Sequence, residues 1–270
     1  MKAILFPDPA RILAAFVGVW VALSGALAAE PKLEFAKDGS GVYGYKDTPK
    51  LPWCEYVVHD PDRPAPKRVN PGPALPAAPA PADAIMLFDG KNVSQWRSNS
   101  WRVVDGCFET YGEVMPRTKE QFGSFQLHLE WLPPEKFDGP WYNRGNSGVA
   151  IHGLYEIQIF DSWTEKWCPD GQCAAVYAQT PPLVNACRPP GEWQSFDIAF
   201  AAPVMIEGKV AQPPRITVFH NGVLVHLNQE IYGGTGHRTL PRPVKISEGP
   251  ITLAGHGCAV RFRNIWIRRL

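Results

Sequence analysis

Three features are scarce in this 270-residue sequence: an excess of either charge, long apolar runs, and helical periodicity. Lys and Arg number 27 and Asp and Glu 26, so the chain lacks the basic surface that nucleic acids require. The same balance argues against a highly charged substrate, and we expect a neutral ligand. Beyond the N-terminus no apolar run approaches the length of a membrane span. The absence of a convincing helical period argues against an α-helical domain.

The first 28 residues predict an export signal. Lys2 and Arg11 precede an apolar run at 12–23, and the small residues at 26–28 suit a signal peptidase. A membrane anchor is the alternative, but about a dozen apolar residues are too few to span about 30 Å of hydrocarbon. Removing Lys2, Arg11 and Asp8 with this segment leaves 25 basic and 25 acidic residues. We therefore expect a periplasmic or secreted protein with no membrane span in its mature chain.

The cysteines all lie in the part of the chain predicted to be exported, at positions 54, 107, 168, 173, 187 and 258. An oxidising compartment allows up to three disulfides among them. The loop from Cys168 to Cys173 is short, and this pair is the first disulfide that we expect. Zinc binding is an alternative, but no second pair of cysteines has matching spacing, so disulfides or free buried thiols are favoured.

Composition divides the mature chain into an N-terminal arm at 29–84 and a domain at 85–270. The arm contains a Pro-Ala run at 71–81, which predicts an extended linker. Before this run the arm carries aromatic residues but no periodic pattern, so we expect an ordered segment over the main domain rather than a fold of its own.

Residues 85–270 predict strand after strand. Apolar and polar residues alternate over 125–131 and again over 196–200, which is the period of two of a half-buried strand. Asn221-Gly222 separates two further strand patterns and predicts a tight hairpin. The alternation slips near Asn264, as a β-bulge would cause. Many strands with few helices indicate an all-β fold, an antiparallel β-sandwich.

One predicted strand carries an unusual polar set. His152, Glu156 and Gln158 share parity and leave one face, while Tyr155, Ile157 and Ile159 leave the other. If the isoleucines pack in the core, the polar set faces outwards. Asp161 has the wrong parity for that face, and a one-residue bulge near Phe160 would restore it.

Aromatic residues crowd the same part of the chain at Trp141, Tyr142, Trp163 and Trp167. Flat rings beside carboxylates and amides suit a sugar, because rings stack on its C–H face and polar groups bind its hydroxyls. Each residue also has a structural interpretation. The polar strand residues can face solvent, Asp161 can form a turn, and the tryptophans can be structural.

Several motifs occur in a fixed order along the domain: LFDGKNVSQW at 87–96, RGNSG at 144–148, YEIQIFD at 155–161, PGEWQ at 190–194, NG at 221–222 and VRFRNI at 260–265. Together they resemble the 3-keto-glucoside lyase/hydratase domain, also called 3-keto-disaccharide hydrolase, over about residues 85–270. The resemblance implies a jelly roll of the concanavalin A-like lectin/glucanase type. Many relatives have Leu-Gln-Asp-His-Gly where this chain has Leu253-Ala-Gly-His-Gly257, so His256 remains without the acid before it.

The resemblance implies cleavage of a sugar that is oxidised at C3. The ketone acidifies the C2–H, so a base can form an enolate, the C1–O bond then breaks by elimination, and water adds to the product. This chemistry needs a base, an acid and a donor at the enolate oxygen. We expect Glu156 or His256 as base or acid, with Asp161 as the other carboxylate.

The remaining site residues have expected binding roles. Gln158, Asn146 and Arg144 would orient hydroxyls or the carbonyl, His152 is a wall residue or a ligand, and the sugar would stack on Trp141, Tyr142 or Trp163. A Ca²⁺ or Mg²⁺ ion is conceivable at Glu156, Gln158 and Asp161, whose oxygen atoms suit hard cations better than zinc. The oligomeric state stays open.

Two other functions remain open. In one, Glu156 and Asp161 are the paired carboxylates of a retaining endoglucanase, which lie about 5–5.5 Å apart. In the other, the domain is a non-catalytic carbohydrate-binding module, for which aromatic and amide groups suffice.

Overall fold

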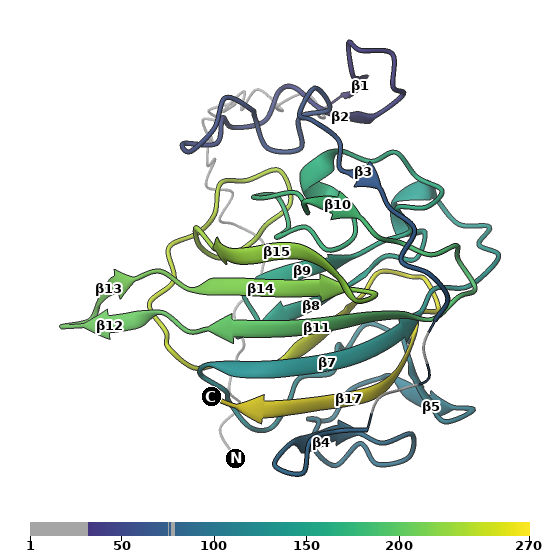
Figure 1. Cartoon of the computed structure of the whole chain (residues 1–270), viewed down its shortest axis with the longest axis vertical. Coiled ribbons are helices and arrows are strands. Elements are labelled where there is room, and N and C mark those ends of the chain that lie inside the picture. Colours follow the sequence, from purple (N-terminus) through teal and green to yellow (C-terminus); the bar gives the residue numbers. More distant parts are fainter. Residues whose placement is uncertain (1–31, 75, 77–78) are drawn as a thin grey trace, which may run out of the picture. The chain divides into compact units, whose positions relative to one another are not determined.

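The computed structural model describes residues 32–74, 76 and 79–270 (Figure 1). The predicted export signal at 1–28 lies outside the described residues. The Pro-Ala run at 71–81 is described except at positions 75, 77 and 78. No helix in the described part of the chain has both the length and the apolar character needed to cross a bilayer.

An antiparallel sheet of eight strands forms the larger layer of a β-sandwich (Figure 1). Its order is β15 (Val223–Glu230), β14 (Arg215–His220), β11 (Gln194–Ala201), β7 (Phe125–Leu132), β17 (Arg261–Arg269), β6 (Cys107–Glu109) and β5 (Arg102–Val104), and β4 (Ile85–Phe88) also pairs with β17. A separate hairpin of β12 (Val204–Ile206) and β13 (Lys209–Gln212) lies between β11 and β14 in the chain. The all-β prediction is confirmed.

A three-stranded antiparallel sheet forms the second layer, in the order β16 (Thr252–Gly255), β8 (Ser147–Ile151) and β9 (Tyr155–Ile159). In Figure 1, β8 and β9 lie behind the larger sheet. Residues 174–177 continue the layer beyond β9, because Val176 forms an antiparallel bridge with Ile157 and the Tyr177 N–H donates to the Glu156 carbonyl.

The core fills the space between the two sheets, as the alternation predicts. The larger sheet contributes the apolar positions of β7 and β11, and the smaller sheet contributes Tyr155, Ile157 and Ile159, all of them almost fully buried. Each such side chain stabilises the fold by about 1.5–3 kcal/mol relative to an exposed one. Because successive side chains of β9 point to opposite faces, packing these three fixes Glu156 and Gln158 on the outer face.

Two local predictions are confirmed. Asn221 and Gly222 connect β14 to β15 with φ of 53° and 79°, the left-handed pair that a tight hairpin turn of this kind uses. At the slip near Asn264, the pairing of β17 with β7 shifts register between Arg263 and Trp266, and Asn264 has φ 47°. A β-bulge therefore bends β17 where the alternation breaks.

The N-terminal arm packs against the domain where the structure describes it, at 32–74, 76 and 79–84. Strands β1 (Leu33–Phe35) and β2 (Tyr43–Tyr45) pair with each other, and β3 (Lys67–Arg68) pairs in parallel with β10 (Val184–Asn185). Tyr43 bridges to Trp167, beside the short 3-10 helix η2 (Pro169–Gly171). The second 3-10 helix, η1, spans Trp141–Asn143. The arm therefore reaches the outer side of the smaller sheet.

The predicted Cys168–Cys173 disulfide is wrong for this structure, in which all six cysteines are free. The turn of η2 separates the two side chains. Cys168 lies beside His59 and Asp170, whereas the thiol of Cys173 lies beside that of Cys187.

Candidate functional site

The outer face of the smaller sheet has a floor of small side chains. Ala254 on β16 lies opposite Gly148 on β8, and Ala150 on β8 lies opposite Glu156 on β9. Glycine and alanine leave room above a sheet that larger residues would fill. The polar groups Glu156 and Gln158 rise from β9 at the edge of this floor, as their parity predicted.

Glu156 is half-buried, and burial raises the pKa of its carboxyl group to about 7. Its backbone is fixed on both sides, since its N–H donates to Thr235 Oγ1 at 3.1 Å and its carbonyl accepts from the Tyr177 N–H at 3.0 Å. A carboxyl group that titrates near neutral pH exchanges a proton readily in both directions. A pKa shift of this kind is characteristic of a general acid or base.

The absence of a side chain at Gly148 leaves the space that the Glu156 carboxylate occupies. A Cβ atom on Gly148 would lie 2.2 Å from Glu156 Oε1 and 3.0 Å from its Cδ. The carboxylate therefore lies directly over the glycine, in space that any other residue would occupy. This contact links the RGNSG motif to the YEIQIFD motif.

Tyr177 and His237 form one rim of the site. Tyr177 is the cross-strand neighbour of Glu156. Burial is the main cause that raises the pKa of Tyr177, and the negative charge of Glu156 raises it further. The Tyr177 hydroxyl lies 2.8 Å from His237 Nδ1. Burial lowers the pKa of His237 to about 4, helped by nearby His59 and Arg238, so its ring is neutral at pH 7. When Tyr177 donates to Nδ1, the proton of the neutral ring is on Nε2, which becomes a hydrogen-bond donor.

The arm contributes His59 to the same cluster. Its ring centroid lies 5.1 Å from that of Tyr177 and 5.3 Å from that of His237. Asp170 holds this residue twice, accepting the His59 N–H at 2.9 Å and lying 3.3 Å from Nδ1. Burial would raise the pKa of Asp170, but the charge and hydrogen bonds of His59 keep it below its usual range. His59 Nε2 is buried and has no hydrogen-bond partner among the described residues.

The predicted aromatic residues lie in two places. Trp141 packs within the cluster, with ring centroids 4.9 Å from both Tyr43 and Trp167. Tyr142 is 54% exposed, and Trp163 is stacked under Arg68, whose guanidinium carbon lies 4.3 Å from the ring centroid. Trp141 and Trp167 are thus tied by ring contacts to the group that surrounds His59, and the ring centroid of Trp167 lies 5.6 Å from that of His59.

Arg144 and Asn146 lie beside this aromatic group. Arg144 pairs with Glu165 at 3.0 Å, and Glu165 also accepts a hydrogen bond from the Tyr43 hydroxyl at 2.9 Å. Asn146 donates to the Tyr142 carbonyl at 2.6 Å. Both side chains hold the segment before β8 in position.

Gln158 shares the outer face with Glu156 but is buried under the loop at 171–175. Its Nε2 lies 3.4 Å from the Gly171 carbonyl, and its backbone bonds Ala174 and Ala175. It supports the segment that leads to Tyr177.

Asp161 lies beyond the paired strand. The β8–β9 register is unbroken from Ser147↔Ile159 to Ile151↔Tyr155, so the bulge predicted near Phe160 does not occur within the pairing. Asp161 Oδ1 instead accepts the N–H groups of Trp163 and Thr164 at 3.2 and 3.0 Å, as a turn former does. The residue also lines a small interior cavity with Cys173 and Cys187.

The two predicted histidines have different surroundings. His152 does not continue the outward parity, because it begins the turn to β9 with φ 56° and packs on Phe200 in the core, 5.0 Å between ring centroids. His256 follows β16 directly and is exposed, with the parity of Ala254. The structure thus brings Glu156 together with Tyr177, His237 and His59, three residues that the sequence did not single out.

Two groups of His, Cys, Asp and Glu in the described part of the chain have ligand atoms within 4.8 Å of one another: His59 with Cys168 and Asp170, and Cys173 with Cys187 and His220. Neither includes Glu156. In the first group the histidine and the carboxylate already bond each other.

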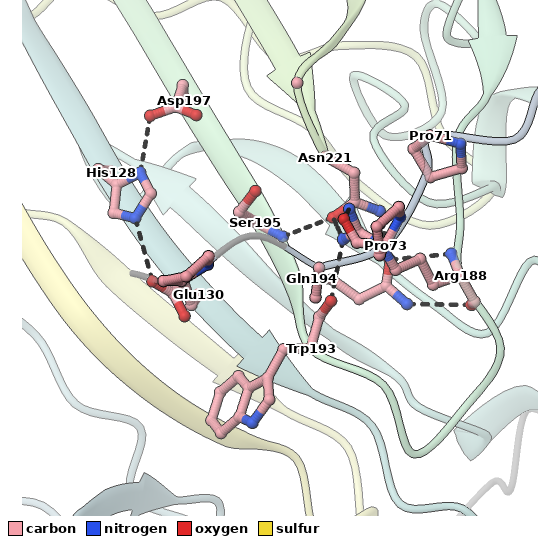
Figure 2. Close-up of a pocket in the computed structure, with 13 residues that line it drawn as sticks. Pro71, Pro73, His128, Glu130, Arg188, Trp193, Gln194, Ser195, Asp197 and Asn221 are labelled. Carbon is pink, nitrogen blue, oxygen red and sulfur yellow. Dashed lines mark hydrogen bonds and ion pairs between the residues drawn. The ribbon is translucent and has the colours of Figure 1, made fainter. Parts of the chain in front are cut away.

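The outer face of the larger sheet carries a groove of about 280 Å³ beside Pro71, Pro73 and Pro76 of the arm (Figure 2). Its charged residues are paired. His128 Nδ1 lies 2.7 Å from Asp197, and Glu130 accepts from Arg263 at 2.7 Å. Arg188 donates to the carbonyls of Gly72 and Pro73. These contacts attach the arm to the sheet, so we interpret the groove as structural.

The His128 pair gives the stability a pH dependence. Burial would lower the pKa of His128, but Asp197 and Glu130 outweigh it and raise the pKa from 6.5 to about 9. The folded state then holds a proton that the unfolded state loses, so this contribution is complete below pH 6.5 and is lost by pH 9. We expect the free energy of unfolding of the wild type, measured with urea, to fall by about 1 kcal/mol across this window. The effect is this small because solvent screens the half-exposed Asp197. The loss should vanish in His128→Gln and shrink in Asp197→Asn, where Glu130 still faces the ring; an unchanged slope in both would contradict it.

Comparison with known proteins gives the following matches. The family profile described as a 3-keto-alpha-glucoside-1,2-lyase-like domain matches residues 83–268. A candidate glycosyl hydrolase from Parabacteroides distasonis ATCC 8503 is 40% identical with a TM-score of 0.69, over 77% of this chain and 93% of that one. Another candidate glycosyl hydrolase from that organism is 26% identical with a TM-score of 0.51, over 69% and 99% of the two chains. A search of curated protein sequences gave no match.

Proposed function

Because the chain belongs to the 3-keto-alpha-glucoside-1,2-lyase-like family, we propose that it cleaves 3-keto-glucosides or 3-keto-disaccharides by elimination and hydration. The observation that supports this most is Glu156, a carboxyl group with a pKa of about 7 beside an open floor of small residues. The C2 proton next to a ketone is acidic enough for such a base.

In the proposed first half-reaction, Glu156 takes the C2 proton and the electron pair of that bond moves towards the C3 carbonyl. The enolate is stabilised by a donor at its oxygen. Neutral His237, whose Nε2 carries the proton when Tyr177 bonds Nδ1, supplies such a donor. A neutral donor suits this step, because an imidazolium would give up its proton instead of sharing it.

In the second half-reaction the enolate collapses, the C1–O bond breaks, and the leaving oxygen takes a proton. Two groups can supply this proton. Glu156 now carries the proton from C2, and His59, on the other side of the cluster, has an Nε2 with no hydrogen-bond partner among the described residues. Water then adds at C1 and a proton returns to C2, which restores the 3-keto sugar. A group that titrates near pH 7 can serve as base in one step and acid in the next.

Tyr177→Phe tests the role of the hydroxyl. We expect kcat to fall by about 10- to 100-fold, because His237 loses the bond that fixes its tautomer. The pH–rate profile should also change, which a purely structural role would not produce. Tyr111→Phe, at a 56% exposed tyrosine away from the site, is the matched control. Equal rates for the two variants would exclude Tyr177 from the mechanism.

A retaining glycosidase is less well supported. It would need a second carboxylate about 5–5.5 Å from Glu156. Asp161 was the candidate, but one of its oxygens bonds the turn at Trp163 and Thr164 and the residue lines an interior cavity. A pure binding module has no use for a carboxyl group whose pKa is raised to about 7.

The deciding experiment is to incubate the purified protein with a 3-keto-disaccharide in D₂O and to analyse the products by mass spectrometry and NMR. Elimination and hydration predict released sugar and enzyme-dependent deuterium at C2, above a control without enzyme. Turnover without deuterium uptake would indicate direct hydrolysis instead. Turnover of an unoxidised β-glucan, with none of the 3-keto sugar, would overturn the proposal.

Export to the periplasm or medium, division into an arm at 29–84 and a domain at 85–270, and a Ca²⁺ or Mg²⁺ ion at the enolate are part of the same proposal. N-terminal sequencing of the secreted protein tests export. Assays with chelator and with added Ca²⁺ or Mg²⁺ test the ion.

A further inference from the structure

Three soft ligand atoms meet inside the protein, away from the outer face that carries Glu156. The ligand atoms of Cys173, Cys187 and His220 all lie within 4.8 Å of one another. They come from three segments: the loop after η2, the loop after β10, and the end of β14. All three residues are buried, with exposures of 3%, 3% and 1%.

His220 has no evident structural reason to be polar. It takes the inward position that Ile216 and Val218 take on β14, and its ring is stacked 5.4 Å from Trp131. Its Nε2 is buried and has no hydrogen-bond partner in the described part of the chain. Leaving a buried polar atom unsatisfied costs about 1–3 kcal/mol, so an apolar residue would be more stable here unless the nitrogen binds something.

A second unsatisfied atom belongs to Asp161, which lies outside this group of three but shares a cavity with its two cysteines. Asp161 is 4% exposed, and its Oδ2 has no partner among the residues that the structure describes. Asp161, Cys173 and Cys187 line one cavity of about 10 Å³, close to the about 10–15 Å³ that a single water-sized atom needs. The cavity therefore has the size of one ion and is bordered by two thiols and a carboxylate.

We propose that Cys173, Cys187 and His220 bind one zinc ion, with the Asp161 carboxylate as the fourth ligand. Two sulfurs, one imidazole nitrogen and one carboxylate oxygen are zinc's usual donors, and four protein ligands make a closed, structural site. On binding, each thiol loses its proton to solvent as its Zn–S bond forms.

The surroundings suit this charge. Zn²⁺ with two thiolates and one carboxylate carries a net charge of −1, and the positively charged residue Arg188 lines the same cavity. The ion would join two loops to the end of β14, and one of these loops belongs to the segment between Gln158 and Tyr177.

A Cys173–Cys187 disulfide is the competing state, because the two thiols are in contact. Forming it requires an oxidant to take up two electrons and two protons. It would account for the two sulfurs but would leave His220 Nε2 and Asp161 Oδ2 unsatisfied. Those two atoms are the reason for preferring the ion.

The test uses the full chain purified without chelator, with metal measured by mass spectrometry and the apo protein reloaded with Co²⁺. We expect about one zinc per chain, and for the cobalt form a thiolate-to-metal charge-transfer band in the near ultraviolet. Cys187→Ser should lose both, whereas Cys107→Ser, at another buried free cysteine, should keep both. The wild-type cobalt spectrum decides the question even if Cys187→Ser fails to fold.

Two results would overturn the proposal. One is a metal-free protein with six titratable thiols after denaturation, and the other is a Cys173–Cys187 cross-link found by peptide mapping without reduction. Neither bears on the reaction at Glu156, so this inference and the proposed function fail independently.

Discussion

Glu156→Gln is expected to lower kcat for a 3-keto-disaccharide by about 10³-fold or more, because general acid–base catalysis by a positioned side chain contributes about 10²–10⁴-fold. Glutamine keeps the shape and the backbone bonds of the residue but cannot take the C2 proton. For the wild type, kcat/KM should rise through a pH of about 7, as the base ionises. The residual activity of the variant should lack this titration.

The same variant should be more stable than the wild type above neutral pH. Burial raises the pKa of Glu156 from 4.5 to about 7, so between these values the folded state holds a proton that the unfolded state has released. The wild type therefore loses stability as pH rises through this window, by at most about 3 kcal/mol. Glutamine does not titrate, and its advantage should appear at pH 8 and disappear at pH 4.

Kinetics and urea unfolding of one preparation check both effects. Glu113→Gln, at an exposed glutamate, should change neither. Retention of full activity by Glu156→Gln would remove the residue from the reaction. Lost activity with lost stability at pH 8 would indicate that the carboxylate holds the fold, contrary to the pKa argument.

Much of the fold could be predicted because its signals are local. The alternation at 125–131 places apolar residues on one side of β7, and that side is buried. Asn221-Gly222 and the slip at Asn264 mark a hairpin and a bulge, since both depend on the φ values of one or two residues. Parity likewise placed Glu156 and Gln158 on the outer face.

Parity fails where the strand ends. His152 and Asp161 flank β9, and alternation describes neither, because a turn with φ 56° precedes the strand and a turn formed by Asp161 itself follows it. The rim of the site has no local signal. His59 meets Asp170 across 111 residues, and Tyr177 meets His237 across 60. Such contacts exist only once the arm and the loops have packed on the sheet.

Gly148→Ala is expected to lower kcat by about 10²-fold without unfolding the protein, because displacing a catalytic group by about 1 Å can cost that much. The added Cβ would lie 2.2 Å from Glu156 Oε1, so the carboxylate has to move. The obstacle is the end of a flexible side chain, so it can rotate away without shifting β8. The substitution should therefore lower kcat and leave the stability of the fold nearly unchanged.

The matched control is Gly123→Ala, where the nearest atom to an added Cβ lies at 3.6 Å, an ordinary contact. It should leave kcat unchanged. The pH–rate profile gives a second readout, since a carboxylate pushed off the floor towards solvent should titrate nearer its ordinary value of 4.5. A Gly148→Ala enzyme with wild-type kcat and an unchanged profile would mean that the position of Glu156 over the glycine is not needed for the reaction.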